Sequence, residues 1–268
     1  MKLKGKTSPL VSVIMNCHNG EKYLRESIKS IISQTYNNWE IIFWDNCSND
    51  KSKQILLSFN DKRIKYFYSK KILKLYHARN LAVKKSKGKY ISFLDTDDTW
   101  DKNKLKIQIN YLKKSKKKII YTNYYILNNI KKSKKLFSEK KLFEGHITQK
   151  LLNNYKIGIL TILIEKEIFQ KHSFNKKYQV IGDFDLFIRL SCNFYIQCVQ
   201  RPLASYRIHT ENFSEKNRDL HIEELKYWIN KNNFSFKKKS INIYKQKIVL
   251  FKLIVKKYMA PIIFFFGI

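Results

Sequence analysis

The chain contains few of the residues that interrupt regular structure, and few acidic residues. Among its 268 residues are 7 glycines and 3 prolines, so its turns must depend on asparagine, aspartate and serine. Its four cysteines never show the two-residue spacing of zinc and redox motifs, which favours reduced thiols. A hydrophobic content of 44% provides ample material for a core. This composition excludes a disordered chain, a collagen-like chain and a small disulfide-stabilised protein.

Two glycine-rich phosphate-binding motifs are also absent. The sequence contains neither Gly-x-Gly-x-x-Gly nor Gly-x-x-x-x-Gly-Lys-Ser/Thr. Their absence argues against a dinucleotide-binding fold and a P-loop. A phosphate group would therefore have to be bound by a metal ion and by cationic side chains.

The shortage of acidic residues is concentrated at the C-terminal end. The whole chain has 54 Lys and Arg against 21 Asp and Glu, a formal net charge of +33. Residues 151–224 are nearly balanced, with 10 cationic and 9 acidic residues, whereas residues 225–268 contain 10 lysines and no carboxylate. Such a basic field favours anionic partners: phosphorylated small molecules, nucleic acid or an anionic membrane surface.

The C-terminal segment permits two interpretations. Apolar and aromatic residues recur at helical spacing, with lysines elsewhere around the helix; they are Tyr244, Ile248, Phe251, Val255 and Tyr258. The uncharged run that follows is shorter than the ~17–25 residues that span a bilayer. A basic amphipathic helix with an aromatic end suits the membrane interface. A terminal helix packed on the core fits the same pattern equally well.

The N-terminal region gives an expectation for the cellular location. Its apolar run, Leu10–Met15, is too short for the core of a signal peptide and is better explained as a buried strand. We therefore expect a cytoplasmic protein. If the C-terminal helix binds lipid, the protein would be peripheral on the inner face of the membrane.

Strands and helices alternate regularly over the first 125 residues. Strands are expected at residues 10–15, 40–44, 63–68, 90–94 and 119–125, and the runs at 10–15 and 40–44 are largely apolar. Between them, helices are expected around residues 23–32, 50–59, 77–86 and 105–112. This α/β alternation predicts a doubly wound, mostly parallel sheet flanked by helices, because continuous apolar strands are buried on both sides.

The second half of the chain is less regular. Residues 126–150, rich in lysine and asparagine, predict a loop or an irregular insertion. Strands are expected at residues 158–165, 195–199 and 203–208, and a helix at residues 183–192. We therefore expect one domain over residues 1–215, with halves at about 9–125 and 126–215, and a basic helical C-terminal extension over residues 216–268.

Carboxylates gather at the ends of two expected strands. Asp45 follows one strand, and Asp95, Asp97 and Asp98 follow another. Ligands of open α/β sheets bind at the carboxyl ends of strands. Three carboxylates within four residues repel one another unless a cation lies among them, and Mg²⁺ or Mn²⁺ would take oxygen ligands and bridge to phosphate. The alternative is a solvated loop that caps the next helix, but the position after a buried strand favours the metal site.

Six groups of motifs follow one another along the chain: Val11–Leu24, Ser33–Tyr36 with Trp39–Asp50, Ala78–Asn80, Gly88–Asp98, Gly182–Leu186 and Tyr206–His209. In order and spacing they resemble family 2 glycosyltransferases over about residues 9–214. The resemblance implies a GT-A fold and metal-dependent transfer of a sugar, usually with inversion, from a nucleotide-sugar donor. A UDP-sugar is the favoured donor class. The expected acceptor is a glycan or a lipid-linked sugar in surface polysaccharide synthesis.

The same resemblance implies roles for single residues. Asp183 matches the catalytic base. Asp95 and Asp97 would form the Asp-x-Asp pair, with Asp97 the direct metal ligand. His209 matches a histidine that helps some members to hold the metal or the diphosphate. Asp45 would bind the uracil or ribose side of the donor. The other donor-binding residues would be Asn16, His18, Asn19, Arg79, Asn80 and Thr96.

Some positions depart from the family pattern. His18 stands where tyrosine is frequent, Asn46 where a second aspartate is frequent, and Gly182 where glutamate is frequent. Asp185 lies two residues after Asp183, on a different face of the expected helix. We expect Asp185 to cap the start of that helix rather than to act as the base.

Three other functions are compatible with parts of the pattern. A nucleotidyltransferase shares the sheet and an acidic metal site, but it usually has a glycine-rich basic loop where this chain has Asn16–Gly20. The basic composition suggests a nucleic-acid-binding protein, but no face interleaves basic and aromatic residues, so we expect no nucleic-acid partner. The third alternative is a protein that retains the transferase fold only for binding. The intact acidic motifs argue against it.

Overall fold

The fold is a single sheet with helices on both faces. The computed structural model describes residues 8–212 and 217–266. Its strands are β1 Val11–Cys17, β2 Trp39–Asp45, β3 Ile64–Tyr68, β4 Tyr90–Phe93, β5 Thr99–Trp100, β6 Ile119–Asn128, β7 Ser133–Leu136, β8 Leu163–Glu165 and β9 Gln197–Ile208. Its helices are α1 Glu21–Ile32, α2 Ser52–Leu57, α3 Leu75–Lys85, α4 Lys104–Ser115, α5 Thr148–Asn153, the 3₁₀ turn η1 Ile159–Thr161, α6 Lys166–Lys171, α7 Gly182–Ser191, α9 Arg218–Lys238 and α10 Tyr244–Phe266.

The sheet has a parallel half and a mixed half. The strand order is β3-β2-β1-β4-β8-β6-β9-β5, with β7 paired to β6. Strands β1 to β4 are parallel, as the buried apolar runs predict. Strand β8 is antiparallel to both β4 and β6, and β6 is parallel to β9. The predicted α/β sheet is therefore confirmed, and its second half is mixed.

The second half differs from the expectation in three places. The strand expected at residues 158–165 is limited to β8, because residues 159–161 form the 3₁₀ turn η1. Residues 126–150 are not wholly irregular, because β6 continues to Asn128 and pairs with β7 in an antiparallel hairpin. The two strands expected at residues 195–199 and 203–208 are one long strand, β9. The pairing of β9 with β6 shifts register near Asn123, which lies opposite Pro202. Strand β9 therefore continues past the irregular pairing at Pro202 instead of ending there.

Two apolar clusters lie on the two faces of the sheet. Helices α1, α2 and α4 pack over one face. Helices α3, α5, α6, α7 and α9 pack over the other. Side chains of β1 alternate between the clusters, with Val13 on the first face and Ile14 on the second. Alternation of this kind requires burial on both sides, which explains why the strand is apolar throughout.

Helix α9 belongs to the core. Trp228 is 1% exposed, lies in the second cluster and donates a hydrogen bond from Nε1 to Asp185 Oδ1 at 3.1 Å. Leu225 and Phe236 of the same helix are buried in that cluster. The expected start of the C-terminal extension, residue 216, is therefore not the edge of the packed core.

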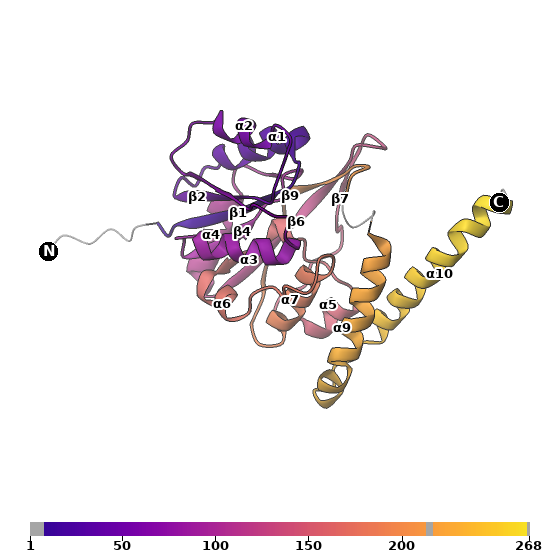
Figure 1. The fold of residues 1–268 in the computed structure, drawn as a ribbon. Coiled ribbons are helices and arrows are strands. Elements are labelled where there is room, and N and C mark those ends of the chain that lie inside the picture. The colour runs from indigo at the N-terminus through magenta and orange to yellow at the C-terminus, as the bar shows by residue number, and fades with distance from the viewer. Residues whose placement is uncertain (1–7, 213–216, 267–268) are drawn as a thin grey trace.

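Helix α10 leaves the body of the molecule (Figure 1). It packs against α9, and Lys257 Nζ lies 3.0 Å from Asp219 Oδ1. Several of its large apolar side chains are exposed, including Phe251 and Tyr258. None of the described helices is both long and apolar enough to cross a bilayer.

Replacing Trp228 by alanine tests whether α9 is part of the core. The change would open a cavity and remove the donor to Asp185, so we expect a loss of about 3–5 kcal/mol in the free energy of unfolding. Urea denaturation measures it. Phe234→Ala, at a site 72% exposed on the same helix, should change stability by less than about 0.5 kcal/mol. Equal effects of the two variants would contradict the packing of α9.

Candidate active site

The acidic loop after β4 is fixed by bonds to three other parts of the chain. Ser27 Oγ of α1 donates to the carbonyl oxygens of Asp95 and Asp98, at 2.9 and 2.7 Å. Asp98 is 1% exposed, and its Oδ1 accepts the backbone N–H of Arg207 at 2.9 Å. Burial and the neighbouring carboxylates raise the pKa of Asp98 well above its usual range. Asp98 therefore anchors the loop to β9 and is not available as a ligand.

Arg207 supports the same loop from β9. Its Nε donates to the carbonyl oxygen of Asp97 at 2.8 Å, and its Nη2 forms an ion pair with Glu26 at 2.7 Å. The guanidinium also lies over the ring of Tyr23. These contacts show that the guanidinium of Arg207 holds the acidic loop in place. None of them indicates that Arg207 binds phosphate.

Arg79 of α3 neutralises Asp95. The guanidinium is buried and forms an ion pair from Nη2 to Asp95 Oδ1. Burial alone would lower the pKa of Arg79, but Asp95, together with Tyr76 and Asp183, opposes that effect, and the pKa is raised. The predicted donor-pocket arginine thus lies beside the Asp-x-Asp pair.

Asp97 and His209 lie together at the same loop. His209 Nε2 is 2.9 Å from Asp97 Oδ2. Burial, followed by repulsion from Asp95, raises the pKa of the Asp97 carboxyl, so a nearby positive charge would stabilise its ionised form. Two carboxylates and one imidazole are suitable donors for Mn²⁺ or Mg²⁺.

The protein alone does not provide a complete metal cage. No group of three His, Cys, Asp or Glu side chains suited to holding a metal occurs within residues 8–212 and 217–266. A magnesium-type ion is usually held by one or two carboxylates, substrate phosphates and water. Asp97 and His209 would therefore supply only part of the coordination of such an ion, and a bound diphosphate and water would have to complete it.

A cavity of about 310 Å³ joins this acidic loop to the start of α7. Six residues predicted to bind the donor or the metal line it: Asn16, His18, Arg79, Asp95, Thr96 and Asp97. Asp183 lines the same cavity. Both polar atoms of the Asn16 side-chain amide are buried and have no hydrogen-bond partner among the described residues. A buried amide without partners costs about 1–3 kcal/mol, so a ligand that pairs with it would be favoured.

Three predicted donor-binding residues lie outside the lining of this cavity. Asp45 is 1% exposed, and one of its carboxylate oxygens accepts the hydroxyl of Tyr66 at 2.8 Å. Asn19 hydrogen-bonds to the loop that follows β2. Asn80 hydrogen-bonds to both backbone groups of Phe174, at 2.8 and 3.1 Å. In this structure they hold the surrounding loops together, and their contact with a donor stays a prediction.

Asp183 lies in the first turn of α7. Its Oδ1 accepts the backbone N–H of Phe184 at 2.7 Å and the hydroxyl of Tyr76 at 3.2 Å. Burial raises the pKa of Asp183, although these two bonds and the charge of Arg79 partly oppose the effect. A raised pKa makes the ionised carboxylate a stronger proton acceptor.

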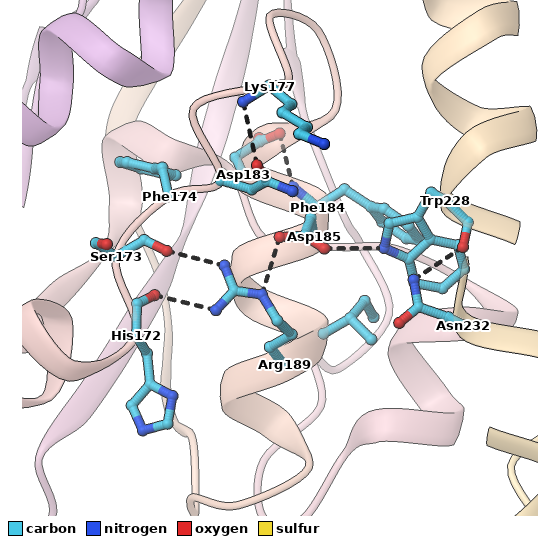
Figure 2. A network of polar contacts seen from close by, with 12 residues as sticks. His172, Ser173, Phe174, Lys177, Asp183, Phe184, Asp185, Arg189, Trp228 and Asn232 are labelled. Atoms are coloured by element: carbon cyan, nitrogen blue, oxygen red, sulfur yellow. Dashed lines mark hydrogen bonds and ion pairs between the residues drawn. The ribbon is translucent and has the colours of Figure 1, made fainter. Parts of the chain in front are cut away.

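Asp185 is held differently from the expectation. It does not cap the helix: it is 4% exposed and lies between two partners, as Figure 2 shows. Its Oδ2 pairs with Arg189 Nε at 2.9 Å, and its Oδ1 accepts the Trp228 indole. Arg189 also donates to the carbonyl oxygens of His172 and Ser173. This network fixes α7, and hence Asp183, against α9.

Sequence reasoning missed Glu224 of α9. Its carboxylate accepts the backbone N–H groups of Gln179, Val180 and Ile181, at 2.6, 2.9 and 3.1 Å. These three residues immediately precede the helix that carries Asp183. The available signal was that Glu224 is the last carboxylate before the acid-free C-terminal region.

The sequence is similar to known proteins. The profile described as Glycosyl transferase family 2 matches residues 12–179. The chain belongs to glycosyltransferase family 2. It is 33% identical over 222 residues, 80% of this chain and 85% of the relative, to the Escherichia coli protein named UDP-Glc:alpha-D-GlcNAc-diphosphoundecaprenol beta-1,3-glucosyltransferase WfgD. It is 32% identical over 161 residues, 59% of this chain and 63% of the relative, to the Bacillus subtilis protein named putative teichuronic acid biosynthesis glycosyltransferase TuaG.

Solved structures show the same GT-A fold. Staphylococcus aureus TarS in complex with UDP has a TM-score of 0.61 and 19% identity, covering 80% of this chain and 65% of that one. The mannosyltransferase PcManGT from Pyrobaculum calidifontis, with GDP-Man and Mn²⁺, has a TM-score of 0.63 and 12% identity, covering 84% and 65%. This family 2 chain is therefore a glycosyltransferase with a GT-A fold.

Replacing Glu224 by glutamine tests whether α9 positions Asp183. The amide keeps one acceptor oxygen and turns an N–H group toward backbone donors, so stability should fall by about 1.5–3 kcal/mol. Sugar transfer, measured well below the melting temperature, should fall as well. The matched control is Glu223→Gln, an exposed neighbour on the same helix, which should leave both quantities unchanged. A silent Glu224→Gln variant would contradict the positioning role.

Proposed function

We propose that this chain transfers a sugar, with inversion at the anomeric carbon, from a UDP-sugar to a hydroxyl group of a lipid-linked or other glycan acceptor. The reaction would serve surface polysaccharide synthesis and depend on Mn²⁺ or Mg²⁺. The observation that carries the proposal is the cavity that joins Asp183 to the Asp95–Asp97 loop. It combines one proton acceptor with one acidic site for a metal-bound diphosphate, the two requirements of inverting transfer.

The proposed reaction uses the two ends of the cavity separately. Asp183 accepts the proton as the acceptor O–H bond breaks. The acceptor oxygen then bonds to the anomeric carbon, and the bond from that carbon to the diphosphate oxygen breaks on the opposite face. A divalent ion, when bound, supplies positive charge to the departing diphosphate. Asp97 and His209 would hold that ion, and the Arg79 ion pair would fix Asp95 beside it.

The relatives support the donor and acceptor classes. WfgD is named for a UDP-glucose donor and an acceptor linked to diphosphoundecaprenol, and TarS was solved with UDP and with UDP-GlcNAc. TuaG is named for teichuronic acid biosynthesis. A nucleic-acid partner has no comparable support, since carboxylates line the cavity and would repel a phosphate backbone without a bound metal.

Membrane contact through α10 is part of the proposal. The helix exposes Tyr244, Phe251 and Tyr258 together with several lysines. Exposed aromatic groups mixed with lysines suit the interface of an anionic membrane. Such contact would place the enzyme at the inner face, where a lipid-linked acceptor would be available.

Thermal stabilisation by nucleotides tests the donor site. UDP with Mn²⁺ should stabilise the folded chain by about 2.7 kcal/mol at 100 times its Kd, and more than GDP, CMP or dTDP does. Asp97→Asn should abolish the metal-dependent part, because it removes a charged ligand. Differential scanning fluorimetry with and without Mn²⁺ provides the measurement.

The control for this test is Asp101→Asn, which removes an exposed negative charge near the same loop. It should retain the full stabilisation by UDP and Mn²⁺. If no nucleotide stabilises the protein while DNA or RNA binds in a salt-sensitive manner, the transferase proposal fails.

Asp183→Asn should separate catalysis from stability. Loss of the base should lower turnover by about 10²–10⁴-fold. Because burial raises the folded-state pKa, ionised Asp183 opposes folding at pH values above that pKa, and this cost disappears below the unfolded-state pKa. The neutral variant should therefore be at least as stable as the wild type at pH 7. A substantially lower melting temperature, or retained turnover, would contradict the assignment.

A further inference from the structure

A second cavity, of about 670 Å³, lies next to the first. It is bounded by α5, the start of α7, α9 and α10. Asp183 and Val180 line both cavities. The proposed base therefore lies where the two spaces meet, and a molecule in the second cavity would approach Asp183 from the side away from the acidic loop.

The lining of the second cavity combines apolar surface with positive charge. Leu152, Phe184 and Leu225 provide apolar surface, and Lys245 and Lys252 provide two positive charges. Asp183 is the only carboxylate among its lining residues. This chemistry is unlike that of the first cavity, which is lined by three carboxylates. It favours a ligand with an apolar part and an anionic part.

Helix α10 presents one face to this cavity. Four of its residues line the cavity. They are Lys245 and the residues three, four and seven positions after it: Ile248, Val249 and Lys252. Residues at this spacing share one face of a helix. The two lysines therefore lie two turns apart, roughly 10 Å along the axis, on either side of an apolar step. Lys247 and Lys256 are exposed on the same helix and do not line the cavity.

Two buried polar atoms at this cavity have no hydrogen-bond partner among the described residues. They are the hydroxyl of Tyr155 and Oε1 of Gln246, and both residues line the cavity. Tyr155 and Asp183 line the same cavity. Unpartnered buried polar atoms favour a ligand with hydroxyl groups or other hydrogen-bonding atoms.

We propose that the second cavity binds the acceptor as a phosphorylated lipid carrying a sugar. This inference rests on the proposed function. The sugar hydroxyl lies at Asp183, the phosphate or diphosphate is bound by Lys245 and Lys252, and the lipid follows the apolar face of α10 toward the membrane. Helices α9 and α10 then select the acceptor, while the family motifs bind the donor.

Binding of farnesyl diphosphate to the full-length chain tests this proposal without knowledge of the acceptor sugar. Isothermal titration calorimetry without metal should show saturable binding by the wild type and much weaker binding of farnesol. Lys245→Ala with Lys252→Ala should weaken farnesyl diphosphate binding about tenfold or more, because both cations that face the phosphate are lost. Lys247→Ala with Lys256→Ala removes the same charge from α10 outside the cavity and should change the Kd less than twofold.

Three outcomes would overturn the proposal. They are no saturable binding, equal weakening in the two double variants, and displacement of farnesyl diphosphate by UDP, which would place it in the donor cavity. Equal losses of binding to phosphatidylglycerol vesicles in both variants, without a selective loss for farnesyl diphosphate, would assign the lysines to the bulk membrane surface. Stabilisation by UDP and Mn²⁺ is measured on the same samples. If it persists while the lipid diphosphate fails to bind, this proposal is wrong and the proposed function stands.

Discussion

The crowding of three carboxylates after β4 is the electrostatic constraint on which the arrangement of the site depends. Each carboxylate has its own partner: Arg79 pairs with Asp95, His209 contacts Asp97, and the backbone of β9 donates to Asp98. The partners come from α3, from β9 and from the residues after it, so satisfying the loop ties the parallel half of the sheet to the mixed half. The acidic motif therefore also fixes the relation between the two halves of the fold.

The sequence was most informative where structure and chemistry are local. Strands β1, β2 and β4 could be predicted because each is a largely apolar run, and the acidic loop because it follows one of them. The direction in which a side chain points was harder to predict from the sequence. Asp45 ends its strand as predicted, yet its side chain is buried against Tyr66, because position after a strand does not decide which way a side chain turns. The β6–β7 hairpin was missed because lysine and asparagine hid its pairing.

Contacts across long sequence separations were beyond prediction. Glu224 and Trp228 lie in the segment expected to form a C-terminal extension, residues 216–268, yet they bond to the segment around Asp183, 43 to 45 residues earlier in the chain. Spacing along one helix cannot reveal such a partner, since the match depends on how α9 packs against α7. The composition changes at residue 225, but the packed core continues beyond that point, since Trp228 and Phe236 belong to it.

Burial of Asp183 has opposing consequences for catalysis and folding. Low solvation raises its pKa and strengthens it as a base, while the same low solvation makes its ionised form unfavourable in the folded chain. The nearby clamp from Glu224 holds the preceding segment in place by bonds that do not involve the Asp183 carboxylate. That separation leaves the base free to exchange a proton without loosening its support.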